Sequence, residues 1–154
     1  MQVEEKKSFQ EYLAGGWYIN MSVAIDYTAS NKDQNDPASL HYVGEVDRDG
    51  NRKKNDYERA MLQVGKILER YAYKMRFTAY GFGGKIQNET TGEMFDKDCF
   101  PVKHGAKSIE PNDVYIEGLD EMVREYRDSL KRVELDGPTR FKPVMDHILS
   151  WVKR

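Results

Sequence analysis

The sequence predicts a layered α/β fold in which a central, mostly parallel sheet is flanked by helices. Two observations lead to this prediction. Short apolar runs alternate along the chain with stretches whose apolar residues recur every three or four positions. The first of the apolar runs ends in a cluster of polar residues, which is typical of a strand that leads to a ligand site in an α/β sheet.

The first strand is predicted where the chain first becomes continuously apolar. Val23, Ala24 and Ile25 follow one another without a polar interruption. Such a run is typical of a strand that is covered on both faces in a parallel sheet. We therefore expect a buried strand that ends at Asp26.

The polar end of this strand is the most informative part of the chain. Asp26 closes the strand, and Thr28 and Ser30 follow at two-residue intervals. One carboxylate and two hydroxyls form an oxygen-only donor set, which suits a hard cation such as Mg²⁺ or Mn²⁺. The alternative is an ordinary polar turn, because all three residue types also hydrogen-bond their own backbone in turns.

Helices and strands alternate along the rest of the chain, which favours a Rossmann-like arrangement. The pattern places a polar loop at residues 31–55 with a mobile part at 47–54, a helix at 57–71, a second strand at 75–80, an edge strand within 93–100, and helices at 116–133 and 141–152. In the last helix, the inner side is expected to carry Val144, Met145, Ile148 and Val152.

Four segments carry a family signature in addition to this periodicity. They are SFQEYLAGGWYINMSVAIDYT, SNKDQNDPASLHY, YGFGG and LDGPTRFKPVMDHI, in this order along nearly the whole chain. Together they resemble the copine domain, a member of the von Willebrand factor A group. The second segment is the most specific, because generic von Willebrand A domains share Asp-x-Ser/Thr-x-Ser but not its continuation. The resemblance implies one partial von Willebrand A domain over residues 1–154, incomplete at its C-terminal side, with a linker-like opening at 1–8.

The resemblance also implies a metal-ion-dependent adhesion site. In that family the site takes an aspartate and two hydroxyls from a first loop, a threonine from a second loop and an aspartate from a third. The first-loop roles fall on Asp26, Thr28 and Ser30, and the second-loop role falls on Thr139. The third-loop aspartate has no counterpart before the last residue, Arg154.

A complete domain of this family has about six strands with the first near the centre, whereas this sequence supplies about three. By this resemblance, we expect the first strand to keep one unpaired edge. An apolar strand with a bare edge tends to pair with another chain. The remaining strands are therefore expected from another part of a longer protein or from another chain.

Composition narrows the class of partner. The formal net charge is −2, with 39% hydrophobic and 32% charged residues, so the chain lacks the basic footprint of a nucleic-acid-binding protein. No apolar run approaches the roughly 20 residues of a membrane span. A single cysteine, Cys99, is consistent with a reducing compartment. We expect a cytoplasmic location, with membrane association only through the phospholipid-binding C2 domains that precede this domain in copines.

Other chemical motifs are weak. A calcium-loop pattern from Asp47 to Glu58 has Arg52 where a sharp turn needs glycine. The glycines after the second strand indicate a tight strand exit rather than a phosphate loop. His41 is expected to hydrogen-bond structurally, and Cys99 has no nucleophile context. No enzymatic activity is therefore expected.

The expected function is cation-dependent binding of a protein partner that offers an acidic residue to Mg²⁺ or Mn²⁺, with Ca²⁺ as an alternative ion. The chain would then be one module of a calcium-dependent phospholipid-binding protein. Two alternatives remain open. One is a structural, partner-docking domain with a degenerate metal site. The other is a substrate-recruiting module of a larger ubiquitin-ligase-like protein, since some plant relatives join a copine-like domain to a RING domain.

Overall fold

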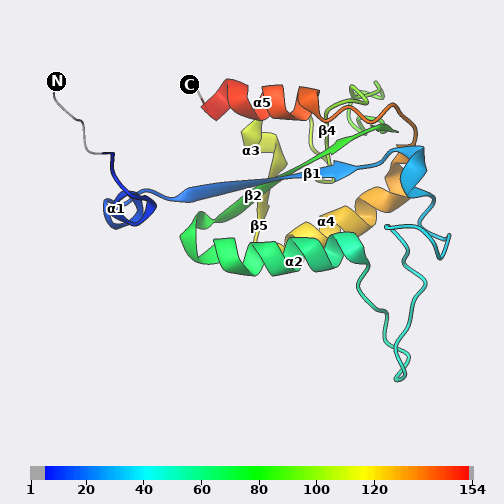
Figure 1. The fold of residues 1–154 in the computed structure, drawn as a ribbon. Coiled ribbons are helices and arrows are strands. Elements are labelled where there is room, and N and C mark those ends of the chain that lie inside the picture. Colours follow the sequence, from blue (N-terminus) through cyan, green and yellow to red (C-terminus); the bar gives the residue numbers. More distant parts are fainter. Residues whose placement is uncertain (1–5, 153–154) are drawn as a thin grey trace.

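A sheet lies between helices on both of its faces, as the sequence predicts (Figure 1). The computed structural model describes residues 6–152, the side chains of Tyr73 and Val152 excepted. Helices α2 (Asp56–Leu68) and α4 (Leu119–Arg132) cover one face, and α5 (Lys142–Val152) lies on the other. Residues 1–5 of the expected linker-like opening lie outside the described residues.

The sheet is mixed rather than mostly parallel. Strand β1 (Ile19–Asp26) runs parallel to β2 (Ala72–Phe82) up to the pair Asp26 and Phe82. Two short strands, β4 (Phe100–Pro101) and β5 (Tyr115–Glu117), pair antiparallel with different parts of β2. A separate antiparallel pair joins β3 (Gly84–Lys85) to β6 (Glu134–Leu135).

Strand β2 organises two apolar cores because its side chains alternate between the two faces. Phe77 and Ala79 are fully buried in the core beneath α2 and α4. Tyr80 and Phe82 belong to a second core, which includes Val144 of α5. Both faces of this strand are therefore covered.

Strand β1 is less enclosed than its apolar sequence predicts. Ile25 is fully buried, whereas Ala24 is exposed, so the expected burial on both faces is wrong at this position. Helix α5, which lies on the other face of the sheet, contacts the neighbouring strand β2. Within the described residues β1 pairs with β2 alone, which confirms the expected bare edge.

Helix α2 forms where the sequence predicts a helix, and its N-terminus is closed by a reciprocal cap. The side chain of Asn55 accepts from the Glu58 backbone, and the Glu58 carboxylate accepts from the Asn55 backbone. A 3-10 turn, η2 (Glu69–Tyr71), continues the helix to the predicted end. Such a reciprocal cap satisfies backbone donors that the first turn leaves free.

Helix α4 begins later than the predicted residue 116. Ile116 belongs to β5 and is buried. Gly118, with a φ of 78°, separates this strand from the helix. Apolar spacing cannot distinguish a strand residue from a helix residue when the two elements share one core. The short helix α3 (Pro111–Val114) precedes β5.

Two further predictions are only partly correct. In α5, Val144 is buried and Ile148 packs against the second core, but Met145 is exposed. The predicted inner position of Val152 falls on a side chain outside the described set. The expected edge strand at residues 93–100 reduces to Phe100 at the start of β4 and an isolated bridge between Gln87 and Met94.

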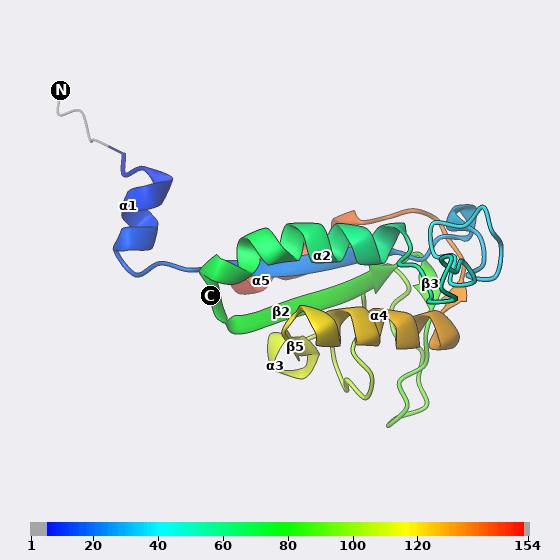
Figure 2. The same ribbon diagram turned by 90° about the horizontal axis from the view of Figure 1, so that it is seen from below.

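The remaining segments extend from this body. Helix α1 (Phe9–Ala14) projects from it and contains no buried residue (Figures 1 and 2). The long loop after the turn η1 (Ala29–Asn31) has no helix or strand before α2 apart from a bridge between Val46 and Arg52. No helix among residues 6–152 combines the length and apolar character that a membrane span requires.

Candidate metal centre

The loop after β1 gathers the three oxygen-bearing side chains that the sequence singles out. Asp26 is half-buried and its Oδ1 accepts a hydrogen bond of 2.8 Å from the backbone N–H of Thr28. The hydroxyls of Thr28 and Ser30 lie 3.0 Å apart. Thr28 is buried and Ser30 is exposed, so the group opens from the interior of the domain toward its surface.

Three donors converge on the backbone carbonyl of Asp26. They are Nδ2 of Asn31 at 2.9 Å, Nε2 of His41 at 2.9 Å and the hydroxyl of Tyr57 at 3.3 Å. These side chains come from the first loop, the long polar loop and helix α2. These bonds fix the backbone of Asp26 where β1 ends, and the N–H of Thr28 holds its carboxylate.

His41 has the structural role that the sequence analysis expects. Its ring stacks on Tyr57 with centroids 4.4 Å apart and on Tyr27 with centroids 5.6 Å apart. A carbonyl can only accept, so Nε2 of His41 donates to Asp26, and Nδ1 accepts from the hydroxyl of Tyr126 at 2.8 Å. Burial lowers the pKa of His41, against the opposing effect of the nearby Asp26.

Tyr126 of α4 links this histidine to the beginning of α2. It is fully buried, and Nδ2 of Asn55 donates to its hydroxyl at 3.1 Å. The hydrogen-bonded chain therefore runs from Asn55 through Tyr126 and His41 to the Asp26 carbonyl. The sequence alone did not indicate that this loop is supported by Asn31, Asn55, Tyr57 and Tyr126. The two tyrosines were not singled out because aromatic residues on a helix face are more simply interpreted as core.

The loop that carries Thr139 is joined to the first loop through the backbone. The N–H of Ala29 donates to the carbonyl of Asp136 at 2.7 Å. Lys97 donates to the carbonyl of Gly137 at 2.7 Å and lies 3.4 Å from the Asp136 carboxylate. Thr139 itself is exposed. The structure thus brings the first-loop residues together. The second loop is hydrogen-bonded to the first through Asp136, three residues before Thr139.

Gly83 lies directly against Thr28 of the first loop. Its φ is 75°, and a Cβ at this position would overlap the Cγ2 atom of Thr28. The backbone N–H of Asp136 donates to the carbonyl of this same glycine at 3.0 Å. The tight strand exit predicted from the glycines is confirmed. The missing side chain of Gly83 also leaves the space that Thr28 occupies.

Gly83→Ala is expected to lower the free energy of unfolding by about 1–3 kcal/mol, through backbone strain and overlap with Thr28. Gly50→Ala is the matched control, because Gly50 has a φ of 81° and nothing within 4 Å of an added Cβ. Urea unfolding of both variants measures the difference. Equal losses in the two variants would contradict the contact with Thr28.

The donor set is poor in carboxylates. No group of three or more His, Cys, Asp or Glu side chains that could hold a metal ion occurs in the part of the chain that the structure describes. Asp26 is the one such residue among the four predicted ligands, and the other three contribute neutral hydroxyls. Hydroxyl and carboxylate oxygens are hard donors, so the set fits Mg²⁺ or Mn²⁺ and leaves such an ion short of negative charge.

The other candidate groups are engaged elsewhere. The Glu58 carboxylate, which would close the calcium-loop pattern, forms ion pairs with Arg52 and Arg127. Asp47 accepts from the backbone of Asp49 and Asn51 within its own turn. These contacts agree with the interpretation of this segment as an ordinary loop.

Cys99 is similarly unsuited to chemistry. It is buried, and burial raises the pKa of its thiol to about 11. The reactive thiolate is therefore scarce near neutral pH.

Comparison with known proteins decides the family. The family model described as Copine matches residues 39–154. The chain belongs to the copine family. Its sequence is 35% identical over 139 residues to Protein BONZAI 1 of Arabidopsis thaliana, an alignment that covers 90% of this chain and 22% of that protein. The copine match includes Thr139 and begins after the first loop, whereas the chain as a whole spans about a fifth of the curated relative's length.

Proposed function

We propose that this copine-family chain is a von Willebrand A-type module that binds a divalent cation and, through it, a protein partner. Asp26, Thr28, Ser30 and Thr139 would hold the ion. The observation that carries the proposal is the close approach of the Thr28 and Ser30 hydroxyls, 3.0 Å apart, beside a carboxylate fixed by the Thr28 N–H. Hydroxyls placed together at the end of a strand suit a hard cation.

The cation would supply an electrophilic point at the surface of the loop. With one carboxylate among the four donors, an Mg²⁺ or Mn²⁺ ion keeps most of its positive charge, and Ca²⁺ is the alternative ion. An acidic side chain of a protein partner is the complementary ligand. The residues of this chain would orient the ion, and the bonds to the Asp26 carbonyl would keep their arrangement rigid.

The proposal describes a binding module without enzymatic activity of its own, acting in the cytoplasm. Membrane association would belong to other parts of a longer copine. The charge balance of this chain supports that division, because its net charge of −2 offers no attraction for an anionic surface.

A second candidate is a structural, partner-docking domain whose metal site is degenerate. It is favoured by the low number of carboxylates in the site, since one carboxylate binds a divalent ion weakly without further anionic ligands. Under this alternative, contacts to a partner would survive removal of divalent cations with EDTA.

Calorimetric titration with Mg²⁺ and with Mn²⁺ tests the proposal. The unmodified chain is expected to bind saturably, and Asp26→Ala to lower the affinity by about tenfold or more, the equivalent of about 1.4 kcal/mol. Thr139→Ala is expected to weaken binding by a smaller factor. Asp47→Ala is the control, because this half-buried carboxylate belongs to the other acidic loop. Equal binding by the Asp26→Ala variant would overturn the assignment, and no binding by any folded variant would favour the degenerate site.

A further inference from the structure

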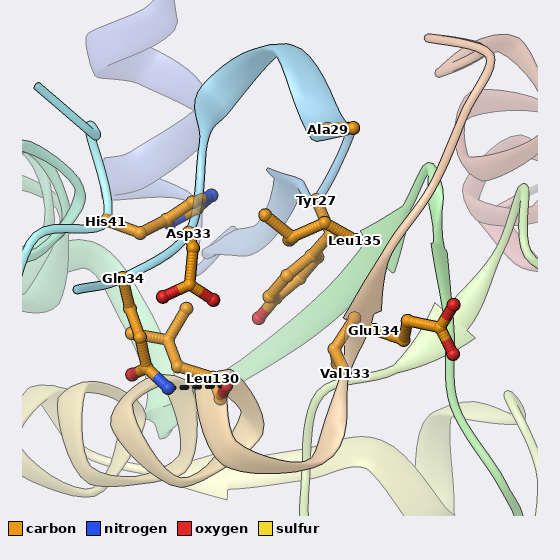
Figure 3. Close-up of a pocket in the computed structure, with 9 residues that line it drawn as sticks. All are labelled: Tyr27, Ala29, Asp33, Gln34, His41, Leu130, Val133, Glu134 and Leu135. Atoms are coloured by element: carbon orange, nitrogen blue, oxygen red, sulfur yellow. Dashed lines mark hydrogen bonds between the residues drawn. The ribbon is translucent and has the colours of Figure 1, made fainter. Parts of the chain in front are cut away.

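A cavity lies beside the first loop, between the chain that follows β1 and the end of α4 (Figure 3). Its volume is about 370 Å³, within the usual range of ligand pockets. Ala29, which separates Thr28 from Ser30 in the sequence, forms part of the wall. The cavity therefore borders the loop that carries the proposed metal site.

The wall opposite the loop is apolar. Leu130 and Val133 are almost entirely buried, and Leu135 of β6 is half-buried. These side chains form a surface suited to an aliphatic group (Figure 3). Burial of apolar surface against them would supply an attraction that does not depend on charge.

The charged residues of the cavity are both acidic. Asp33 and Glu134 line it, and none of its described lining residues is a lysine or an arginine. The carboxylate of Glu134 points away from the cavity, and it pairs with Lys85 at 3.5 Å. The carboxylate of Asp33 points into the cavity (Figure 3).

Asp33 is oriented, and no basic side chain among the described residues forms an ion pair with it. Its Oδ1 accepts from the backbone N–H of Asn35 at 2.9 Å and from Nδ2 of the same residue at 2.7 Å. Those two bonds leave Oδ2 available. The neighbouring Lys32 pairs instead with Asp36 at 3.7 Å, and no ion pair to Asp33 occurs among the described residues.

The two walls of the cavity are connected. Nε2 of Gln34 donates to the carbonyl of Leu130 at 3.0 Å, across the space between the loop and α4. The carbonyl of Gln34 accepts from the backbone of Val43 at 3.0 Å. The shape of the cavity is thus held without a ligand, which reduces the entropic cost of binding one.

We propose that this cavity takes a basic side chain, a lysine or an arginine, of a protein partner. The aliphatic stem lies against Leu130, Val133 and Leu135, and the cationic head meets Asp33. Long basic side chains combine these two characters, and opposite charge across an interface selects the partner. That the partner is a protein rests on the proposed function. Recognition of the basic side chain rests on the cavity alone.

The test uses small probes and needs no metal. Nα-acetyl-lysine amide and Nα-acetyl-arginine amide are titrated into the ¹⁵N-labelled chain in the presence of EDTA, with neutral Nα-acetyl-norleucine amide as the comparison. Backbone amide shifts at residues 29–35 and 130–135 are followed. Saturable shifts in these two segments are expected with a basic probe, and the relative affinities show which of the two cations fits better.

Two variants compare the Asp33 carboxylate, which points into the cavity, with the Glu134 carboxylate, which points away from it. Asp33→Asn keeps an oxygen that can accept from Asn35, and it is expected to weaken binding of the basic probes by roughly fivefold. Glu134→Gln, the matched control, is expected to leave the affinity within about twofold. Equal binding of the neutral probe, unchanged affinity in Asp33→Asn, or no localised shifts would each overturn the proposal. Because EDTA removes divalent ions, failure of the metal site would leave these outcomes unaffected.

Discussion

Tyr126→Ala is expected to lower the free energy of unfolding by about 3–5 kcal/mol. Tyr126 is fully buried between α4 and the sheet. Its removal leaves a cavity and also deprives His41 and Asn55 of their common hydrogen-bond partner. Urea unfolding followed by circular dichroism measures the loss.

Tyr126→Phe separates the two contributions. The ring remains, while Nδ1 of His41 loses its donor and becomes an unsatisfied buried acceptor. We expect a loss of about 1–3 kcal/mol for this variant. The amide shift of Asp26 should also change, because the hydrogen-bonded chain ends on its carbonyl. A phenylalanine variant as stable as the original chain would show that the hydrogen bonds contribute little.

Glu58→Gln is the second variant with a large expected effect, a loss of about 2–3 kcal/mol near neutral pH. The Glu58 side chain is fully buried, and Arg52 and Arg127 both pair with it. Breaking a buried ion pair costs more, about 3–5 kcal/mol. The expected value is smaller because the two arginine side chains are 29% and 41% exposed and can be hydrated.

The effect of this substitution should depend on pH. Burial raises the pKa of Glu58, but hydrogen bonds from Arg127, Arg52 and the Asn55 backbone lower it by more, so its pKa falls below the ordinary value of 4.5. A carboxylate with a lowered pKa stabilises the folded state above its unfolded pKa and loses this contribution as the pH falls through the folded pKa.

The difference in unfolding free energy between the original chain and Glu58→Gln should therefore be full at pH 7 and should shrink below pH 4.5. Urea unfolding at several pH values measures it. The control is Glu45→Gln, whose exposed carboxylate pairs with Lys53 at the surface, where ion pairs contribute about 1 kcal/mol or less. A difference that grows on acidification would contradict the assigned direction of the Glu58 pKa.

The long elements of the fold could be predicted from the sequence. The continuous apolar run ending at Asp26 predicts β1, and the three- and four-residue spacing of α2 reflects one helix face buried against the sheet. The short strands could not be predicted in this way. Ile116 lies in β5 and shares its core with α4, so its apolar character fits either element.

The predicted first-loop ligands could be singled out from the sequence because Asp26, Thr28 and Ser30 follow one another at two-residue intervals from the end of β1. The residues that hold this loop could not. His41 and Tyr126 are 85 positions apart, and their pairing follows from the folding of the long loop over α4. The cavity next to Asp33 likewise exists only after these segments meet.

The most direct test of the metal-centre proposal is to locate bound Mn²⁺ on the ¹⁵N-labelled chain through the paramagnetic broadening of its amide signals. We predict that the signals of residues 26–31 and 137–140 broaden first, that those of residues 47–51 keep their intensity, and that EDTA restores the spectrum. Broadening centred on residues 47–51, or none in the first loop of the folded protein, would contradict the proposed metal centre.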